Sequence, residues 1–238
     1  MNCDHIVALN WGGCGSTGAF WFLGAIGRPY VWDSSQFATS PMGAVANTLN
    51  ESGNLDDAWP AIKNHLVSFE KLRGFTSWPY NLFYKQWDED PDYNAKFIFW
   101  DRPAEDWAKV EFAFQCMRGL GAEFVQYHLI REWVYGTDLN YNSPVAVWQA
   151  WVDRYKKHNS EIRARFEGRD NYMYIDVTID PLTLGDQICE FIGIQNVSHV
   201  HYPGPDAVGG ERSGLIDESG WDETFTSRWN EYSPQVNW

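Results

Sequence analysis

A glycine-rich turn near the start of the chain carries the residue types best suited to chemistry. An apolar run over residues 6–9 leads into the turn, which holds Gly12, Gly13, Gly15, Ser16, Thr17 and Gly18. An apolar segment with helical character follows, so the expected order is strand, turn and helix. Glycine lets the backbone approach a ligand closely, and the N–H groups and dipole at a helix start attract an anion. The pattern therefore predicts a phosphate or sulfate site, and a tight turn without a ligand is the alternative.

The missing lysine and the cysteine of this turn narrow the classes of protein that it could belong to. The nucleoside-triphosphate version ends in Gly-Lys-Ser/Thr, but the first lysine of the chain is Lys63, so a nucleotide kinase is disfavoured. Cys14 lies inside the turn, where a helix N-terminus can lower the pKa of a thiol. We favour the simpler interpretation that Cys14 is a small residue filling a tight turn.

A second informative stretch lies in the middle of the chain. The continuous apolar run Phe97–Trp100 is typical of a buried parallel strand, and Asp101, Arg102 and Pro103 follow it. Side chains at the carboxyl ends of parallel strands face the ligand crevice of an open α/β sheet. Arg102 is therefore a candidate ligand for the anion predicted at the turn, with a surface salt bridge as the equally weighted alternative.

The elements that must position these residues alternate between strands and helices. Strand-like segments lie at 6–9, 30–32, 73–79, 97–100 and 172–177. Helical patterns lie at 55–72, 80–90, 144–166 and 181–192. The alternation predicts an α/β fold with a mostly parallel sheet flanked by helices. We expect a single domain over residues 1–238.

Segment 36–53, next to the predicted anion site, is rich in Ser, Thr, Asn and Gly. This composition predicts a mobile loop with little fixed structure. Asp33 ends the second strand just before it. A carboxylate there is a candidate general base if its pKa is raised, and a turn cap is the alternative.

The helix over residues 144–166 is long and amphipathic. Pro144 occupies its first position, after a capping Ser143. Its Val, Trp and Tyr residues form one face, and its charged residues are expected to form a solvated face. We expect His158 to be a surface residue of this helix.

Composition restricts the ligand classes. The 238 residues carry a formal net charge of −14, which argues against broad affinity for nucleic acid or anionic membranes. No apolar run reaches the roughly 18 residues that span a bilayer, and no leader is evident, so a cytoplasmic protein is expected. The four cysteines, Cys3, Cys14, Cys116 and Cys189, lack metal-ligand or paired spacing, which is typical of a reducing compartment and predicts no metal site.

The order of these segments resembles the sulfotransferase family, which transfers a sulfuryl group from 3′-phosphoadenosine 5′-phosphosulfate on a P-loop-like fold. The resembling stretches are "GFTSWPYNLFYKQWDEDPDYNAKFIFWDRPAEDW" (74–107), "WVDRYKKHNSEIRARF" with its His-Asn-x-x-x-Arg spacing (151–166), "YMYIDV" (172–177), "ICEFIGI" (188–194), and Arg212-Ser213-Gly214 followed by Gly220-Trp221.

The resemblance implies a P-loop NTPase-like sulfotransferase fold and a role for each matching residue. Arg102 matches the arginine that holds the 3′-phosphate. The turn of Arg212, Ser213 and Gly214 matches an element that closes over the same phosphate, within a tail (195–238) that covers the cofactor. The backbone of the first turn is implied to hold the 5′ end; its residues are Gly13, Cys14, Gly15, Ser16, Thr17 and Gly18.

Two departures from the family pattern fall where the sulfuryl group would lie, and a third falls at the 3′-phosphate. Depending on the register of the first turn, Ser16 or Gly13 occupies the position of the family's basic residue. Ser77 stands where the small-acceptor branch has its histidine base. Val110 replaces a serine that helps bind the 3′-phosphate, with Lys109 beside it as a possible substitute, and Arg28 or Lys85 could supply the missing cation.

The sequence thus predicts a sulfotransferase that uses 3′-phosphoadenosine 5′-phosphosulfate. Its acceptor is expected to be a hydroxyl or amine of a small molecule or glycan, with Asp33 or Ser77 near that group. The alternative is a protein that binds 3′,5′-adenosine bisphosphate without turnover, because a positive donor and a general base each contribute roughly 10²-fold or more to such transfers.

Overall fold

The computed structural model describes ten parts of the chain, namely residues 5–11, 14, 22–26, 30–31, 41–67, 74–75, 78–118, 133–134, 144–176 and 181–194. Within them the backbone forms one five-stranded sheet in the order β2-β3-β1-β4-β5, and every neighbouring pair is parallel. The strands are β1 (His5–Ala8), β2 (Tyr30–Val31), β3 (Gly74–Phe75), β4 (Ala95–Asp101) and β5 (Tyr172–Asp176). The predicted α/β class with a parallel sheet is confirmed.

The order of the strands reverses at β1. From β1 the chain passes to β2 and β3 on one side of it, then crosses to β4 and β5 on the other side. In an open α/β sheet such a reversal leaves a crevice at the carboxyl ends of the strands, where ligands bind. The segment after β1 and the segment after β4 both begin at this edge.

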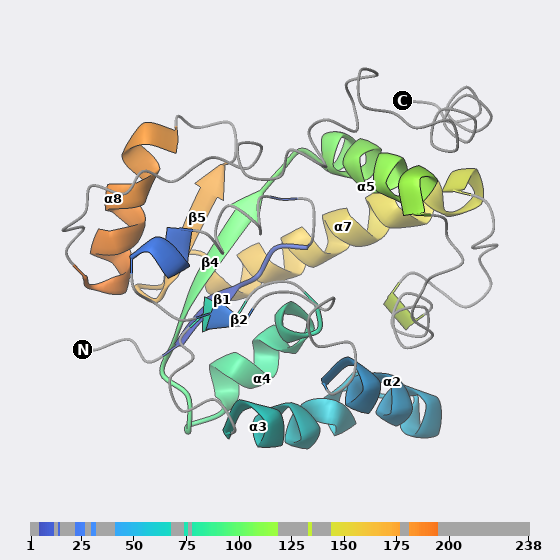
Figure 1. Cartoon of the computed structure of the whole chain (residues 1–238), viewed down its shortest axis with the longest axis horizontal. Coiled ribbons are helices and arrows are strands. Elements are labelled where there is room, and N and C mark those ends of the chain that lie inside the picture. The colour runs from blue at the N-terminus through green and yellow to red at the C-terminus, as the bar shows by residue number, and fades with distance from the viewer. Residues whose placement is uncertain are drawn as a thin grey trace.

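Helices cover the sheet (Figure 1). They are α2 (Pro41–Ser52), α3 (Trp59–Val67), α4 (Tyr84–Glu89), α5 (Ala104–Arg118), α7 (Pro144–Phe166) and α8 (Pro181–Ile192), with 3₁₀ turns η1 (Leu55–Ala58) and η2 (Tyr80–Phe83). The helices and strands that the sequence predicts in these parts of the chain are therefore present, with ends shifted by a few residues.

Residue alternation in β4 shows which helix lies on which face. Neighbouring strand residues point to opposite faces of a sheet. The Lys96 amino group donates to the Phe191 carbonyl of α8, whereas the Phe97 ring packs on Phe166 of α7, with centroids 4.5 Å apart. Helices α8 and α7 therefore lie on opposite faces, as Figure 1 shows. Asp101 points to the same face as Phe97, toward α7.

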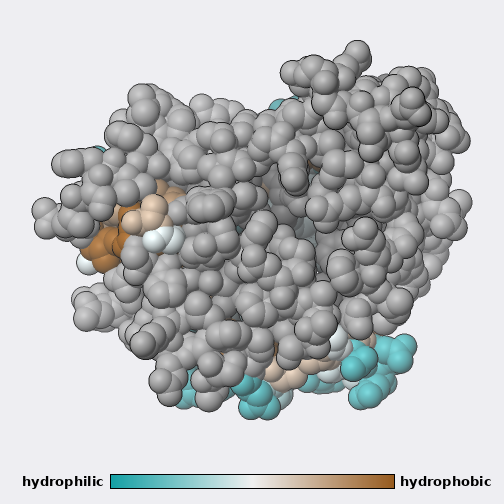
Figure 2. Space-filling model, in the orientation of Figure 1, coloured by the Kyte–Doolittle hydropathy of each residue, from teal (hydrophilic) through white to brown (hydrophobic). Residues whose placement is uncertain are grey.

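The core is rich in aromatic side chains. Phe97 and Trp100 of β4 are each 1% exposed, as expected for a strand buried on both faces. Beneath β3 and β1, Trp87 of α4 packs against Phe75 and Trp59. Among the described residues, Tyr174 is the one large hydrophobic side chain that is exposed. The hydrophilic colour in Figure 2 gathers over α2 and α3, along the lower edge of the view.

The prediction of a loop with little fixed structure over 36–53 is wrong for residues 41–52, which form helix α2. Val45 and Leu49 are buried one helical turn apart and anchor it to the core. The polar residues do not break the helix, because the Thr48 hydroxyl donates to the Ala44 carbonyl and its own carbonyl accepts from Ser52. The helix ends at Ser52, and the next residue, Gly53, has a φ of 67° that suits glycine.

None of the helices in the described parts of the chain is long and apolar enough to cross a membrane.

Candidate functional site

The end of β1 leads directly into the predicted anion turn. Leu9 N–H donates to the Ile98 carbonyl of β4 at 2.9 Å, which extends the strand pairing by one residue. Trp11 follows in the core, and its carbonyl accepts the N–H of Cys14 at 3.4 Å. Cys14 is fully buried. The start of the glycine turn is thus fixed to β4 and to the core.

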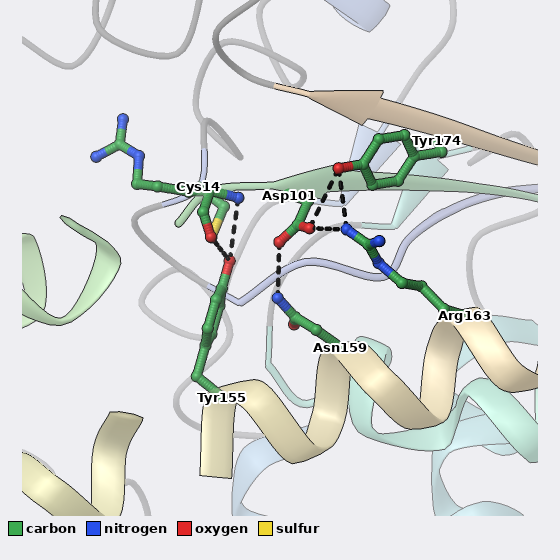
Figure 3. Close-up of polar contacts among 7 residues, drawn as sticks. Cys14, Asp101, Tyr155, Asn159, Arg163 and Tyr174 are labelled. Carbon is green, nitrogen blue, oxygen red and sulfur yellow. Dashed lines mark hydrogen bonds and ion pairs between the residues drawn. The ribbon is translucent and has the colours of Figure 1, made fainter. Parts of the chain in front are cut away.

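The hydroxyl of Tyr155, on α7, joins the turn to the end of β4 (Figure 3). It lies 3.0 Å from the Cys14 sulfur, accepts the N–H of Arg102 at 3.3 Å and donates to the Arg102 carbonyl at 3.2 Å. Its ring stacks on Trp107 of α5, with centroids 4.3 Å apart and planes 6° from parallel. Burial raises the pKa of Tyr155 well above its usual value, so the hydroxyl stays protonated.

The carboxylate of Asp101 collects three donors beside this junction. It accepts from Asn159 at 2.7 Å, from the guanidinium of Arg163, and from the Tyr174 hydroxyl at 3.2 Å. Figure 3 shows Asn159 and Arg163 reaching Asp101 from α7, with Tyr174 on the far side. The Arg163 guanidinium also lies 4.7 Å from the centre of the Tyr174 ring. The end of β4 is therefore held to the middle of β5 and to the C-terminal half of α7 by charge-assisted hydrogen bonds.

An open hollow of 560 Å³ adjoins the carboxyl end of β4. Its lining residues are Asp101, Arg102, Pro103, Ala104, Glu105, Lys156, Asn159, Ser160, Arg163 and Ala164. This volume falls within the roughly 300–1,000 Å³ typical of small-molecule sites. Three cationic and two anionic side chains line it, which gives the lining a formal charge of +1 at neutral pH.

Two of the three cations that line the hollow form ion pairs with its carboxylates. Arg163 pairs with Asp101, and Lys156 pairs with Glu105 at 2.6 Å. The hydrogen bond from Lys156 lowers the pKa of Glu105, so this carboxylate stays charged at neutral pH. Arg102 also lines the hollow, with its backbone held by Tyr155. An anion entering here meets both guanidinium and ammonium groups.

The first turn of α5 adds backbone donors to the same hollow. The helix begins after Pro103, whose carbonyl accepts from the N–H of Trp107 at 2.9 Å. Ala104 and Glu105, at the helix start, line the hollow. The N–H groups of a first helical turn favour an anion, and in α5 the Glu105 N–H donates to the carboxylate of its own side chain. The hollow therefore combines an arginine, a lysine and a helix N-terminus.

His158 is buried, so the prediction that it is a surface residue is wrong. Its Nε2 lies 2.9 Å from the Leu9 carbonyl, and since a carbonyl only accepts, this nitrogen donates. The ring packs on Trp11 at 5.2 Å and is 6% exposed. Burial lowers the pKa of His158 to about 4, which keeps the imidazole neutral at pH 7. The residue belongs to the buried face of α7 because it lies three positions after Tyr155.

Of the residues predicted for the site, the structure describes Cys14 and Arg102 and brings both to Tyr155. Val110 is buried in α5, Lys109 beside it is half-buried, and Lys85 is exposed on α4. The other predicted site residues lie outside the described parts of the chain; they are Gly13, Gly15, Ser16, Thr17, Gly18, Arg28, Asp33, Ser77, Arg212, Ser213 and Gly214. The predicted tail, 195–238, also lies outside them.

No protein-family model matches the chain, and no curated protein matches it in sequence. Within the described parts of the chain, no group of three or more His, Cys, Asp or Glu side chains is arranged to hold a metal ion.

Sequence reasoning assigned no role in this site to Tyr155, Asn159 or Arg163, although the last two belong to the His-Asn-x-x-x-Arg motif that carries part of the family resemblance. They lie at successive intervals of four on α7, so they share one face of the helix. The spacing was visible in the sequence, but nothing in it shows that this face meets the ends of β1 and β4. Only the packing of α7 across the sheet brings them there.

Proposed function

We propose that the protein binds 3′-phosphoadenosine 5′-phosphosulfate and acts as a sulfotransferase on a P-loop NTPase-like fold. The observation that carries the proposal is the meeting of Cys14 and Arg102 on the Tyr155 hydroxyl. A cofactor with phosphate groups at both ends of a nucleoside needs two anion sites a short distance apart. The glycine turn is the proposed site for the 5′ end and Arg102 the proposed ligand for the 3′-phosphate.

Two further observations support this assignment. The strand order reverses at β1, which favours a ligand crevice at the edge where the turn begins. The hollow beside Arg102 has a size suited to part of a nucleotide and carries an anion-attracting helix start. The donor set fits phosphate chemistry, because guanidinium groups and backbone N–H groups both bind phosphate oxygens.

The residues of the chain would hold the donor and leave the sulfuryl group near the acceptor. Transfer of this group resembles phosphoryl transfer, where catalysis comes mainly from positioning and from positive charge around the transferring oxygens. Asp33 or Ser77 is the proposed partner of the acceptor hydroxyl or amine. A carboxylate at position 33 could take the acceptor proton if its pKa is raised.

The test of binding is thermal unfolding with 1 mM 3′,5′-adenosine bisphosphate. A ligand with a Kd of about 10 μM stabilises by about 2.7 kcal/mol at this concentration, which corresponds to a rise in Tm of roughly 5–10 °C for a chain of this size. Arg102→Ala should lose most of the rise. Lys157→Ala is the control, because it removes one positive charge from an exposed position of α7 outside the hollow. No shift in the wild type, or equal shifts in both variants, contradicts the proposal.

Turnover separates the enzyme from a protein that binds without catalysis. The loss of a basic residue and of a histidine at the sulfate end favours the second candidate, which keeps the same nucleotide site. Labelled sulfate transfer from the donor to phenols, glycans and amines would establish an enzyme, and Asp33→Asn and Ser77→Ala would then identify the base. Binding of the bisphosphate without transfer to any acceptor class would favour the non-catalytic protein.

A further inference from the structure

We infer that Tyr155 is a positioning residue that couples the glycine turn to Arg102, so that both phosphates of a nucleotide are bound as one unit. The inference rests on the proposed function for the identity of the ligand. The coupling itself rests on the geometry around one hydroxyl.

The hydroxyl has a partner for each of its hydrogen-bonding sites. A phenol offers one donor and accepts up to two hydrogen bonds. Its hydrogen goes to the Arg102 carbonyl, and it accepts the Arg102 N–H and, in the arrangement that satisfies every group, the Cys14 S–H. Contacts to both the N–H and the carbonyl of one residue fix the backbone on either side of Arg102. They therefore fix the direction in which the arginine side chain leaves the strand end.

The tyrosine ring is held rigidly enough to transmit a displacement. It stacks on Trp107 of α5 and meets the Trp11 ring edge-on, with centroids 5.8 Å apart. Tyr155 is 1% exposed. Close-packed interiors pass strain on rather than absorbing it. A movement of Cys14 when an anion enters the turn is thus passed through the hydroxyl to Arg102, and the reverse holds by linkage.

Ring packing alone does not explain why position 155 holds a tyrosine and not a phenylalanine. A phenylalanine would keep the stack on Trp107 and avoid the cost of burying a polar group. Three atoms that the hydroxyl contacts belong to Cys14 and Arg102, one residue on each proposed anion site, and Asn159, one turn further along α7, also bonds it. The hydroxyl therefore links the two proposed sites, which the ring alone does not do.

The binding test compares three nucleotides, namely adenosine 3′,5′-bisphosphate, adenosine 5′-monophosphate and adenosine 3′-monophosphate, by calorimetry. Tyr155→Phe should lower the affinity for the bisphosphate about tenfold, which is the loss expected for one neutral hydrogen bond in a rigid network. It should lower the affinity for each monophosphate by less than about threefold, because a ligand that fills only one of the two sites does not depend on the coupling between them. Tyr84→Phe is the matched control. It removes the hydroxyl of another buried tyrosine, whose partner is Glu161 at 3.2 Å, and should change none of the three affinities.

Hydrogen exchange provides a second measurement that needs no ligand. In Tyr155→Phe the backbone amides of the segment around Cys14 and of the segment around Arg102 should lose protection together, whereas Tyr84→Phe should leave both unchanged. Failure of the wild type to bind any of the three nucleotides would overturn the proposed function, and the coupling would then be decided by the exchange result. Unchanged protection at either segment, or equal weakening of all three nucleotides in Tyr155→Phe, would overturn the inference.

Discussion

Cys14 and Arg102 meet at a single atom, the hydroxyl oxygen of Tyr155, although they come from segments that follow different strands. Strands β1 and β4 are neighbours in the sheet, so the chain after each of them starts at the same edge. Helix α7 crosses that edge and contacts both segments from one face. The candidate site is therefore defined by a helix as much as by the strand ends that the sequence pointed to.

The lowered pKa of His158 should make the folded protein less stable in mild acid. Its pKa is about 4 in the folded protein and about 6.5 in the unfolded chain, so between these pH values the unfolded chain binds the extra proton. The contribution of the neutral ring is complete above pH 6.5 and falls as pH drops toward 4, by up to about 3 kcal/mol. The free energy of unfolding in urea should be measured between pH 7 and 4. Its slope against pH should correspond to about one more proton bound by the unfolded chain than by the folded protein.

His158→Gln is the control for this prediction. Its amide can still donate to the Leu9 carbonyl but has no proton to gain. Glu105, whose pKa Lys156 lowers by a hydrogen bond, titrates in both proteins and cancels in the comparison. The variant should lose the slope between pH 6.5 and 4 while keeping the acid unfolding at lower pH. Parallel curves for the two proteins would show that His158 does not cause the slope.

The sequence predicts most of the fold because its apolar patterns are strong. The run Phe97–Trp100 has the composition of a strand buried on both faces, and it is one. Helix α2 was missed because its apolar residues are few and its hydroxyls bond back to the helix, a local arrangement that composition does not reveal. The role of His158 depends on which face of α7 meets β1, and that is decided by tertiary packing alone.

The same limit applies to the candidate site. Arg102 could be predicted because the carboxyl end of a buried strand is a general location for ligand residues. The partners of Asp101 on α7 could not, since they lie about 60 residues further along the chain and reach Asp101 only after the helix crosses the sheet. Helical spacing groups Tyr155 with Asn159, but it does not tell which other element they will contact.

The two ion pairs of the hollow should differ in strength. The Asp101 side chain is 15% exposed and is held by two further donors, whereas Lys156 and Glu105 are each more than half exposed. A double-mutant cycle of Asp101→Asn with Arg163→Met should give a coupling of about 1 kcal/mol. The cycle of Glu105→Gln with Lys156→Met should give less than about 0.5 kcal/mol, because exposed pairs are screened and lose side-chain entropy. Equal couplings would show that burial does not set the strength of these pairs.

A further ion-pair cluster should fix the end of α7 to α4. Asp88 is 8% exposed and bonds Arg165 at 2.6 Å and Arg169 at 2.9 Å. Its neighbour Glu89 forms an ion pair with Arg165 and is 67% exposed. Asp88→Asn leaves two guanidinium groups facing a neutral amide, so the free energy of unfolding in urea should fall by about 2 kcal/mol. Glu89→Gln is the matched substitution and should change it by less than about 0.5 kcal/mol. If the two variants are equally stable, the cluster acts as a surface feature and the end of α7 is held by apolar packing instead.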